Sequence, residues 1–152
     1  MNTESALQGG LTGAATLTIL HEIVRKFSPD APRMDELGMQ ALSKLFKKLH
    51  LEVPDKDQLY LLSTGAELLS NGLYYAIAGA GSKDNVYLRG ALLGATAGIG
   101  AITLPGVMGL DDSASNRTPK TKVMTVAWYL LGGIVASAVT EKLQQRLERK
   151  HK

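Results

Sequence analysis

The feature that most constrains this chain is an uncharged stretch between Arg89 and Asp111. As a helix it is long enough to cross the hydrocarbon core of a bilayer, which takes roughly 20 apolar residues. Gly90, Gly94 and Gly98 place a stripe of glycine down one face of that helix. Such a stripe lets another helix approach backbone to backbone, as membrane helices do where hydrophobic burial cannot drive them together. The stretch therefore predicts a membrane-spanning helix with a close helical neighbour.

Three more apolar stretches share this character and also carry small residues. We predict spanning helices at about 5–27, 58–80, 85–109 and 119–141. Charges are crowded between these stretches, whereas a soluble helix carries charge along its whole exposed face. The 152 residues are thus predicted to form one all-α domain, an integral membrane four-helix bundle. The glycines expected at helix–helix contacts are Gly9, Gly13, Gly72, Gly90, Gly94, Gly98 and Gly132.

The composition keeps one alternative open. Hydrophobic residues make up 45% of the chain and charged residues 20%, which is ordinary for a soluble protein. A soluble bundle of very apolar helices is therefore the rival fold.

The segment at about 31–50 differs, because its apolar residues recur at the helical period while lysines occupy other faces. A basic amphipathic helix beside a spanning helix is typical of an interfacial helix in the plane of the lipid headgroups. A soluble helix packed on the protein itself is the alternative. The charged tail at 142–152 is expected to continue the last helix into solvent.

Local signals mark several helix ends. Asp55 followed by Gln58 resembles a capping box, and Thr118 before Pro119 supplies an N-cap and a first-turn proline. The connection at 81–84 is tight, so the two helices that it joins are expected to be antiparallel neighbours. Four spans place both termini on one side of the membrane, and the distribution of Lys and Arg slightly favours the two polar loops in the cytoplasm.

Ionisable groups inside a membrane segment are costly and mark candidate sites. The interior candidates are His21, Glu22 and Glu67, with Asn71 one helical turn from Glu67. Counted from the helix ends, His21 and Glu67 lie roughly 9 and 13 Å deep, so we predict that they meet. Two interpretations stay open. The cluster is a pocket that relays protons or holds a polar ligand, or it is a structural hydrogen-bond clamp between two helices.

Arg33 and Asp35 follow the first helix closely and join the candidates. Both can cap helix ends, which is the structural interpretation. Alternatively, Arg33 can bind the phosphate of a lipid headgroup at the rim of the pocket.

Several standard sites are absent from the sequence. There is no cysteine, and Arg25 stands where an H-E-x-x-H zinc site needs its second histidine. No G-x-S-x-G elbow occurs, so no catalytic residue, metal or cofactor is expected. The basic residues flank apolar stretches and lack the interleaved aromatics of a nucleic-acid site, so the expected partner is the lipid bilayer.

The first helix and its exit resemble a group of small, glycine-rich, four-helix bacterial inner-membrane proteins of unknown function. The residues that carry the resemblance are Gly9, Gly13, Pro32, Met34, Asp35 and Gly38, within about a quarter of the chain. The resemblance implies a multi-pass protein of the cell inner (plasma) membrane and no particular activity.

Two function hypotheses follow from these observations. The first is a structural or accessory module that acts by helix–helix association, as a homo-oligomer or within a larger membrane complex, because one bundle need not consume every glycine face. The second is a small transporter or ligand-binding membrane protein that uses the intramembrane His/Glu pocket.

Overall fold

The computed structural model describes residues 1–150, which are all-α and without a strand, and the chain is 81% helical. The bounds of its α-helices are α1 Thr3–Val24, α2 Met34–Lys48, α3 Lys56–Ala76, α4 Val86–Val107, α5 Ser113–Asn116 and α6 Pro119–Lys150. Two 3-10 turns, η1 (Ile77–Gly79) and η2 (Lys83–Asn85), connect α3 to α4. A helix thus occupies each range expected from the sequence, and α5 is an additional single turn inside the second polar loop.

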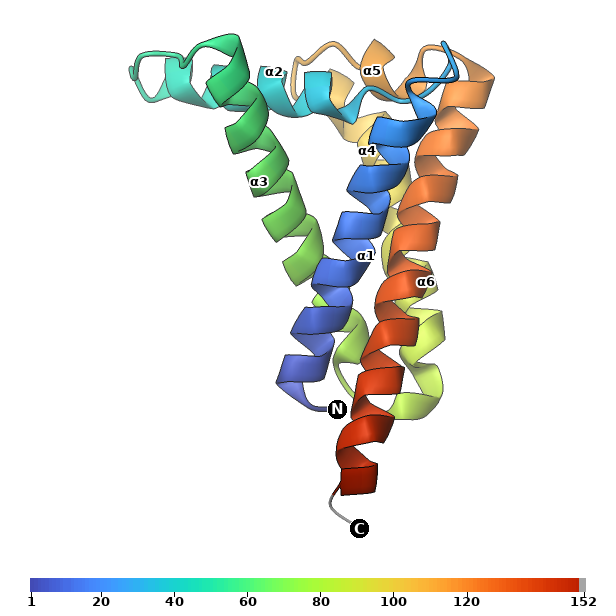
Figure 1. The fold of residues 1–152 in the computed structure, drawn as a ribbon. Coiled ribbons are helices and arrows are strands. Elements are labelled where there is room, and N and C mark those ends of the chain that lie inside the picture. Colours follow the sequence, from blue (N-terminus) through green and yellow to red (C-terminus); the bar gives the residue numbers. More distant parts are fainter. Residues whose placement is uncertain (151–152) are drawn as a thin grey trace.

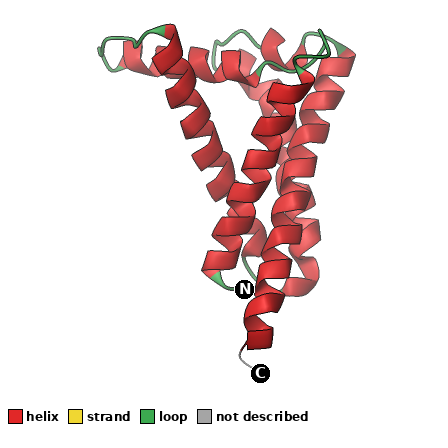
Figure 2. Cartoon of the chain, in the orientation of Figure 1, coloured by secondary structure: helices red, strands yellow, loops and turns green. Residues whose placement is uncertain are grey.

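The four long helices run up and down, while the short ones gather at one end (Figure 1). The amphipathic α2 lies crosswise there, next to α5, and the N-terminus and the end of α6 lie at the opposite end. Short loops make all the connections (Figure 2). α6 continues as one helix past 141, so the tail expected at 142–152 is helical to Lys150, and residues 151–152 lie outside the described part.

α6 organises the bundle, because both α1 and α4 pack along it. Glycine makes these approaches close. A Cβ placed on Gly90 of α4 would lie 2.4 Å from the carbonyl oxygen of Gly133, and one placed on Gly13 of α1 would lie 2.4 Å from that of Gly132. Both values are far below van der Waals contact, so backbone lies directly against backbone on both sides of α6.

The closest approach of α3 to α1 lies in the last turns of α3. A Cβ on Gly10 would lie 2.2 Å from the carbonyl oxygen of Gly72 and 2.7 Å from the nitrogen of Ala76. Earlier in α3, Gly65 has no neighbouring atom within 4 Å of an added Cβ. The small residues that allow close approach lie near one end of α3, and the helix diverges from the bundle toward its other end (Figure 1).

The expectation that the helices at 58–80 and 85–109 are antiparallel neighbours is right for their direction and for the end at which they are connected. They run antiparallel and meet at their connection, where the Arg89 Nε donates to the carbonyl of Ala78 at 2.8 Å. Beyond this point α3 and α4 make few contacts. The glycine stripe of α4 faces α6, and the small residues of α3 face α1, so neither helix keeps a small-residue face for the other.

α2 closes the open end between the diverging helices. Its backbone N–H at Arg33 donates to the carbonyl of Ala114 at 2.8 Å, and its Gln40 Oε1 accepts from the N–H of Asp111 at 2.9 Å. Lys44 also donates to the carbonyl of Met108. Of the two alternatives for this segment, packing on the protein is thus observed from the start of α2 to Lys44, and Leu45 is exposed.

Two helices are long and apolar enough to cross a membrane by length and composition: the segment Lys83–Val107 that contains α4, and α6. In the most apolar 18 residues of each of these helices, only 22% and 39%, respectively, are buried inside the protein. Length and composition thus support two of the four predicted spans, α4 and α6.

Candidate functional site

The divergence of α3 leaves a cleft of about 800 Å³ lined by α2, α3, α4 and Tyr129 of α6. Its walls are almost entirely apolar. Met34 and Leu37 of α2 line one part, and Ala97 and Ala101 of α4 line another. A volume of this size, with mostly apolar walls and a few polar groups, is typical of sites for small organic molecules.

Most polar groups of the cleft come from α3, and Thr96 of α4 adds a hydroxyl. Glu67, Ser70 and Asn71 line the cleft, and Glu67 is the one charged residue of the lining. The Glu67 Oε1 atom is buried and has no hydrogen-bond partner among residues 1–150. Asn71 interacts with the side chain of Tyr129 across the cleft. A buried acceptor without a partner is unfavourable, so Glu67 is the group of this cleft that a hydrogen-bond donor would satisfy.

The charged groups that act on Glu67 are acidic, namely Asp35 and Glu22. The nearby cation, Arg25, is occupied, because it binds both Glu22 at 3.0 Å and Asp35. The hydrogen bond to Asp35 raises the pKa of the Arg25 guanidinium above its usual value, so this guanidinium stays charged. No salt bridge within the described part of the chain reaches Glu67.

His21 and Glu67 do not form the predicted pair, since no hydrogen bond or ion pair joins them among the described residues. His21 is 6% exposed, and both of its ring nitrogens are buried without a partner. Its ring meets that of Tyr129 edge-on, with the centroids 6.0 Å apart. Tyr129 lines the cleft and contacts His21, whereas His21 itself does not line the cleft.

The remaining sequence candidates lie near the α1–α2 junction. Glu22 and Asp35 belong to the triad with Arg25, which ties the end of α1 to the start of α2. Arg33 pairs with Glu36 at 3.1 Å on the exposed surface. Of the six candidates, two line the cleft and one contacts Tyr129, while the other three form ion pairs near the α1–α2 junction. In that order they are Glu67 and Asn71, His21, and Glu22, Arg33 and Asp35.

Sequence analysis missed the tyrosines that build the site. Tyr75 is fully buried and its hydroxyl donates to the carbonyl of Tyr129 at 2.9 Å, while Tyr74 lines the cleft and donates to the carbonyl of Leu93 at 3.3 Å. Their sequence signal was present, because Tyr74 and Tyr75 lie too deep in the predicted helix for interfacial aromatics. A deep tyrosine needs a hydrogen-bond partner, which here is a helix carbonyl.

The glycines predicted at helix contacts lie at contacts within this one chain. A Cβ on Gly9 would lie 2.6 Å from the carbonyl oxygen of Ala136, one on Gly94 would lie 2.6 Å from that of Tyr129, and one on Gly98 would lie 2.7 Å from the Cα of Val126. The stripes that suggested association with other chains are therefore covered by α6 itself.

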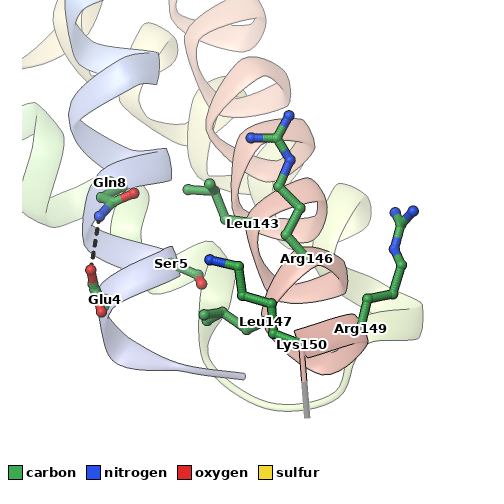
Figure 3. A pocket seen from close by; sticks show the side chains of 8 residues that line it. All are labelled: Glu4, Ser5, Gln8, Leu143, Arg146, Leu147, Arg149 and Lys150. Carbon is green, nitrogen blue, oxygen red and sulfur yellow. Dashed lines mark hydrogen bonds between the residues drawn. The ribbon is translucent and has the colours of Figure 1, made fainter. Parts of the chain in front are cut away.

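A second hollow, of about 430 Å³, lies at the end of the bundle that holds the termini (Figure 3). Glu4 and Gln8 of α1 line one side, where the Gln8 Nε2 donates to Glu4 at 3.1 Å. Arg146, Arg149 and Lys150 of α6 line the other. In Figure 3, Arg146 and Arg149 point away from Glu4, so their charges lie at the rim.

Taken together, the cleft can bind an apolar molecule and offer a carboxylate to it. Residues 1–150 contain no group of three or more His, Cys, Asp or Glu side chains placed to hold a metal ion. Comparison with protein families, with curated proteins and with solved structures finds no match for this chain. The site must therefore be interpreted from its own geometry.

Proposed function

We propose that this chain is a multi-pass protein of the inner (plasma) membrane with α1, α3, α4 and α6 as spans, and that it binds an apolar or amphiphilic molecule in the cleft. The observation that carries the proposal is an apolar cleft of about 800 Å³ with an unpartnered carboxylate oxygen at Glu67. The glycine faces that favoured a purely structural module pack against other helices of the same chain.

The membrane part of the proposal is supported by exposed apolar side chains on all four long helices. A water-soluble protein rarely exposes a continuous apolar band of this extent, whereas lipid covers it without cost. The helices of 21 and 22 residues measure about 32 and 33 Å, which matches a hydrocarbon core of about 30 Å. The exposed residues are Leu7, Leu11, Ile19 and Ile23 on α1, Leu61, Leu62, Leu69 and Leu73 on α3, Leu88, Leu92, Ile99 and Leu104 on α4, and Val123, Leu131 and Ile134 on α6.

Charge placement supports the same topology. Glu67 is the only charged residue between Asp57 and Lys83, so beyond its first turn α3 carries one charged residue, which faces the cleft. The basic residues at the end of α6 and the lysines of α2 would lie at the two headgroup levels, where they attract anionic lipid.

A cysteine-labelling experiment tests the number of spans. The natural chain has no cysteine, so each introduced cysteine reports alone. With four spans, Glu52→Cys and Ser113→Cys react with an impermeant maleimide from one side of the membrane, and Ser82→Cys reacts from the other. If Glu52→Cys labels from the same side as Ser82→Cys, then α3 does not span and the four-span topology is wrong.

The size of the cleft favours a small molecule over a helix from another chain. A spanning helix about 10 Å wide and 30 Å long occupies on the order of 2,000 Å³. The cleft offers about 800 Å³ and is closed at one end by α2. A small amphiphile therefore fits the cleft as it is.

Filling the cleft should displace its ligand. Ala101 of α4 lines the cleft, whereas Leu92 of the same helix is exposed and does not line it. Protein purified in mild detergent is expected to carry one bound small molecule or lipid by native mass spectrometry. Ala101→Phe should lower the occupied fraction about tenfold, since the added ring takes up part of the volume. Leu92→Phe, the control, should leave it unchanged.

Two outcomes would contradict the proposal. Ala101→Phe retaining the bound molecule would place it elsewhere. A stoichiometric partner protein, with no small molecule on the wild type, would instead support the accessory-module hypothesis.

A further inference from the structure

We infer that the cleft selects a lipophilic ammonium ion, whose charge pairs with Glu67 while its apolar body lies against α2 and α4. This inference rests on the proposed function and names the class of ligand. It starts from the charge of the lining, where Glu67 is the one charged residue and no basic side chain is present. A carboxylate in apolar surroundings is costly unless a cation or a hydrogen-bond donor compensates it.

The protein does not supply that cation. Glu67 Oε1 is buried without a partner, and no salt bridge in the described part of the chain involves Glu67. The nearby Arg25 is bound to Glu22 and Asp35. Because Glu22 and Asp35 are also the charged groups that act on Glu67, the surrounding field adds to the attraction for a cation and repels an anion.

The aromatic lining suits the same ligand. Tyr74 and Tyr129 both line the cleft near Glu67, and the hydroxyl of Tyr74 is already engaged with the carbonyl of Leu93. Aromatic faces attract an ammonium ion, and this attraction is stronger where water is excluded. Asn71 adds an amide oxygen, which can accept a hydrogen bond from an N–H of the ligand.

The depth of Glu67 excludes an ordinary phospholipid held by its headgroup. Glu67 lies 11 residues into α3, which is about 16 Å along the helix and close to the middle of the proposed span. A zwitterionic or anionic headgroup at that depth would bring a phosphate next to a carboxylate. A compact ammonium group on an apolar body brings only the complementary charge.

The test uses three probes that share one alkyl chain: dodecylammonium, dodecanol and dodecanoate. Binding is measured to the full chain in nanodiscs of zwitterionic lipid, where partition into lipid is the same for every variant. The wild type is expected to bind dodecylammonium about tenfold more tightly than dodecanol, and dodecanoate more weakly than either. Glu67→Gln should remove the preference for dodecylammonium without weakening dodecanol. Glu52→Gln, at an exposed acidic residue outside the cleft, should leave the preference intact.

The outcomes separate the two proposals. Equal affinity of the wild type for dodecylammonium and dodecanol, with both displaced by Ala101→Phe, would overturn the ammonium inference and leave the apolar cleft in place. Binding of neither probe to any variant would overturn the proposed function itself. If Glu67→Gln does not fold, the loss of binding from the wild type to Ala101→Phe is compared for the three probes. Partition into lipid cancels in that difference, so only a cation-selective cleft ranks the probes in the stated order.

Discussion

Gly90→Ala is expected to destabilise the bundle by about 3 kcal/mol, at the upper end of the cost of overpacking. The added Cβ would lie 2.0 Å from the Ser137 Oγ and 2.4 Å from the carbonyl oxygen of Gly133. Neither group can retreat easily, because the carbonyl belongs to the backbone of α6 and the Ser137 hydroxyl donates to the carbonyl of Val86 at 2.9 Å. α4 and α6 must therefore separate. Thermal unfolding in detergent measures the loss, with Trp128, the one tryptophan, as the fluorescent reporter.

Gly65→Ala is the matched control for this experiment. Gly65 also lies inside a long helix, but nothing lies within 4 Å of an added Cβ. Alanine has the higher helix propensity, by up to about 1 kcal/mol, so the midpoint of unfolding should stay the same or rise. If the two variants behaved alike, α4 and α6 would not be in backbone contact, and the central packing described above would be wrong.

Helix positions were predictable from the sequence because their signals are local. Asp55 caps α3 by accepting from the N–H of Gln58 at 2.9 Å, as the capping pattern predicts. Thr118 does the same for α6, where its hydroxyl accepts from the N–H of Thr121 at 3.0 Å. Each signal depends on residues within one turn, so it needs no knowledge of the tertiary fold.

The partner of each helical face was not predictable in the same way. A glycine stripe predicts a close helical neighbour but does not identify which helix it is. In the structure, the stripes of α1 and of α4 both pack against α6. The chain order suggested that α3 would pack on α4. Its small residues Gly72 and Ala76 instead meet Gly10 of α1, a glycine that sequence analysis had not selected.

Half of the candidate site was predictable from the sequence, because that half depends on helical period within one helix. Glu67 and Asn71 lie one turn apart, so their shared face follows from helical period alone, and both line the cleft. The pairing of Glu67 with His21 depended on the rotation of α1 about its axis, which depth along the helix does not determine. Tyr129 contacts His21 instead, and Arg25 binds Glu22 and Asp35.

Tyr75→Ala is expected to cost about 3 kcal/mol of stability, through the cavity that it leaves. Tyr75 is completely buried, and its ring lies 3.0 Å from a Cβ placed on Gly132, so it fills the space where α3 meets α6. Inside a bilayer this cost arises from lost packing contacts, because lipid tails are as apolar as the protein interior. The same fluorescence measurement of unfolding detects it.

Tyr75→Phe separates the ring from the hydroxyl. It removes the hydrogen bond to the carbonyl of Tyr129 and keeps the ring, so it should cost only about 1 kcal/mol. Equal losses in the two variants would show that the hydroxyl, and not the ring, holds α3 to α6.

The expected difference in stability between Tyr75→Ala and Tyr75→Phe has a consequence for the cleft. With the ring in place, the end of α3 stays fixed to α1 and α6, and the divergence that opens the cleft begins from that fixed point. Tyr75→Phe should therefore bind the alkyl probes like the wild type.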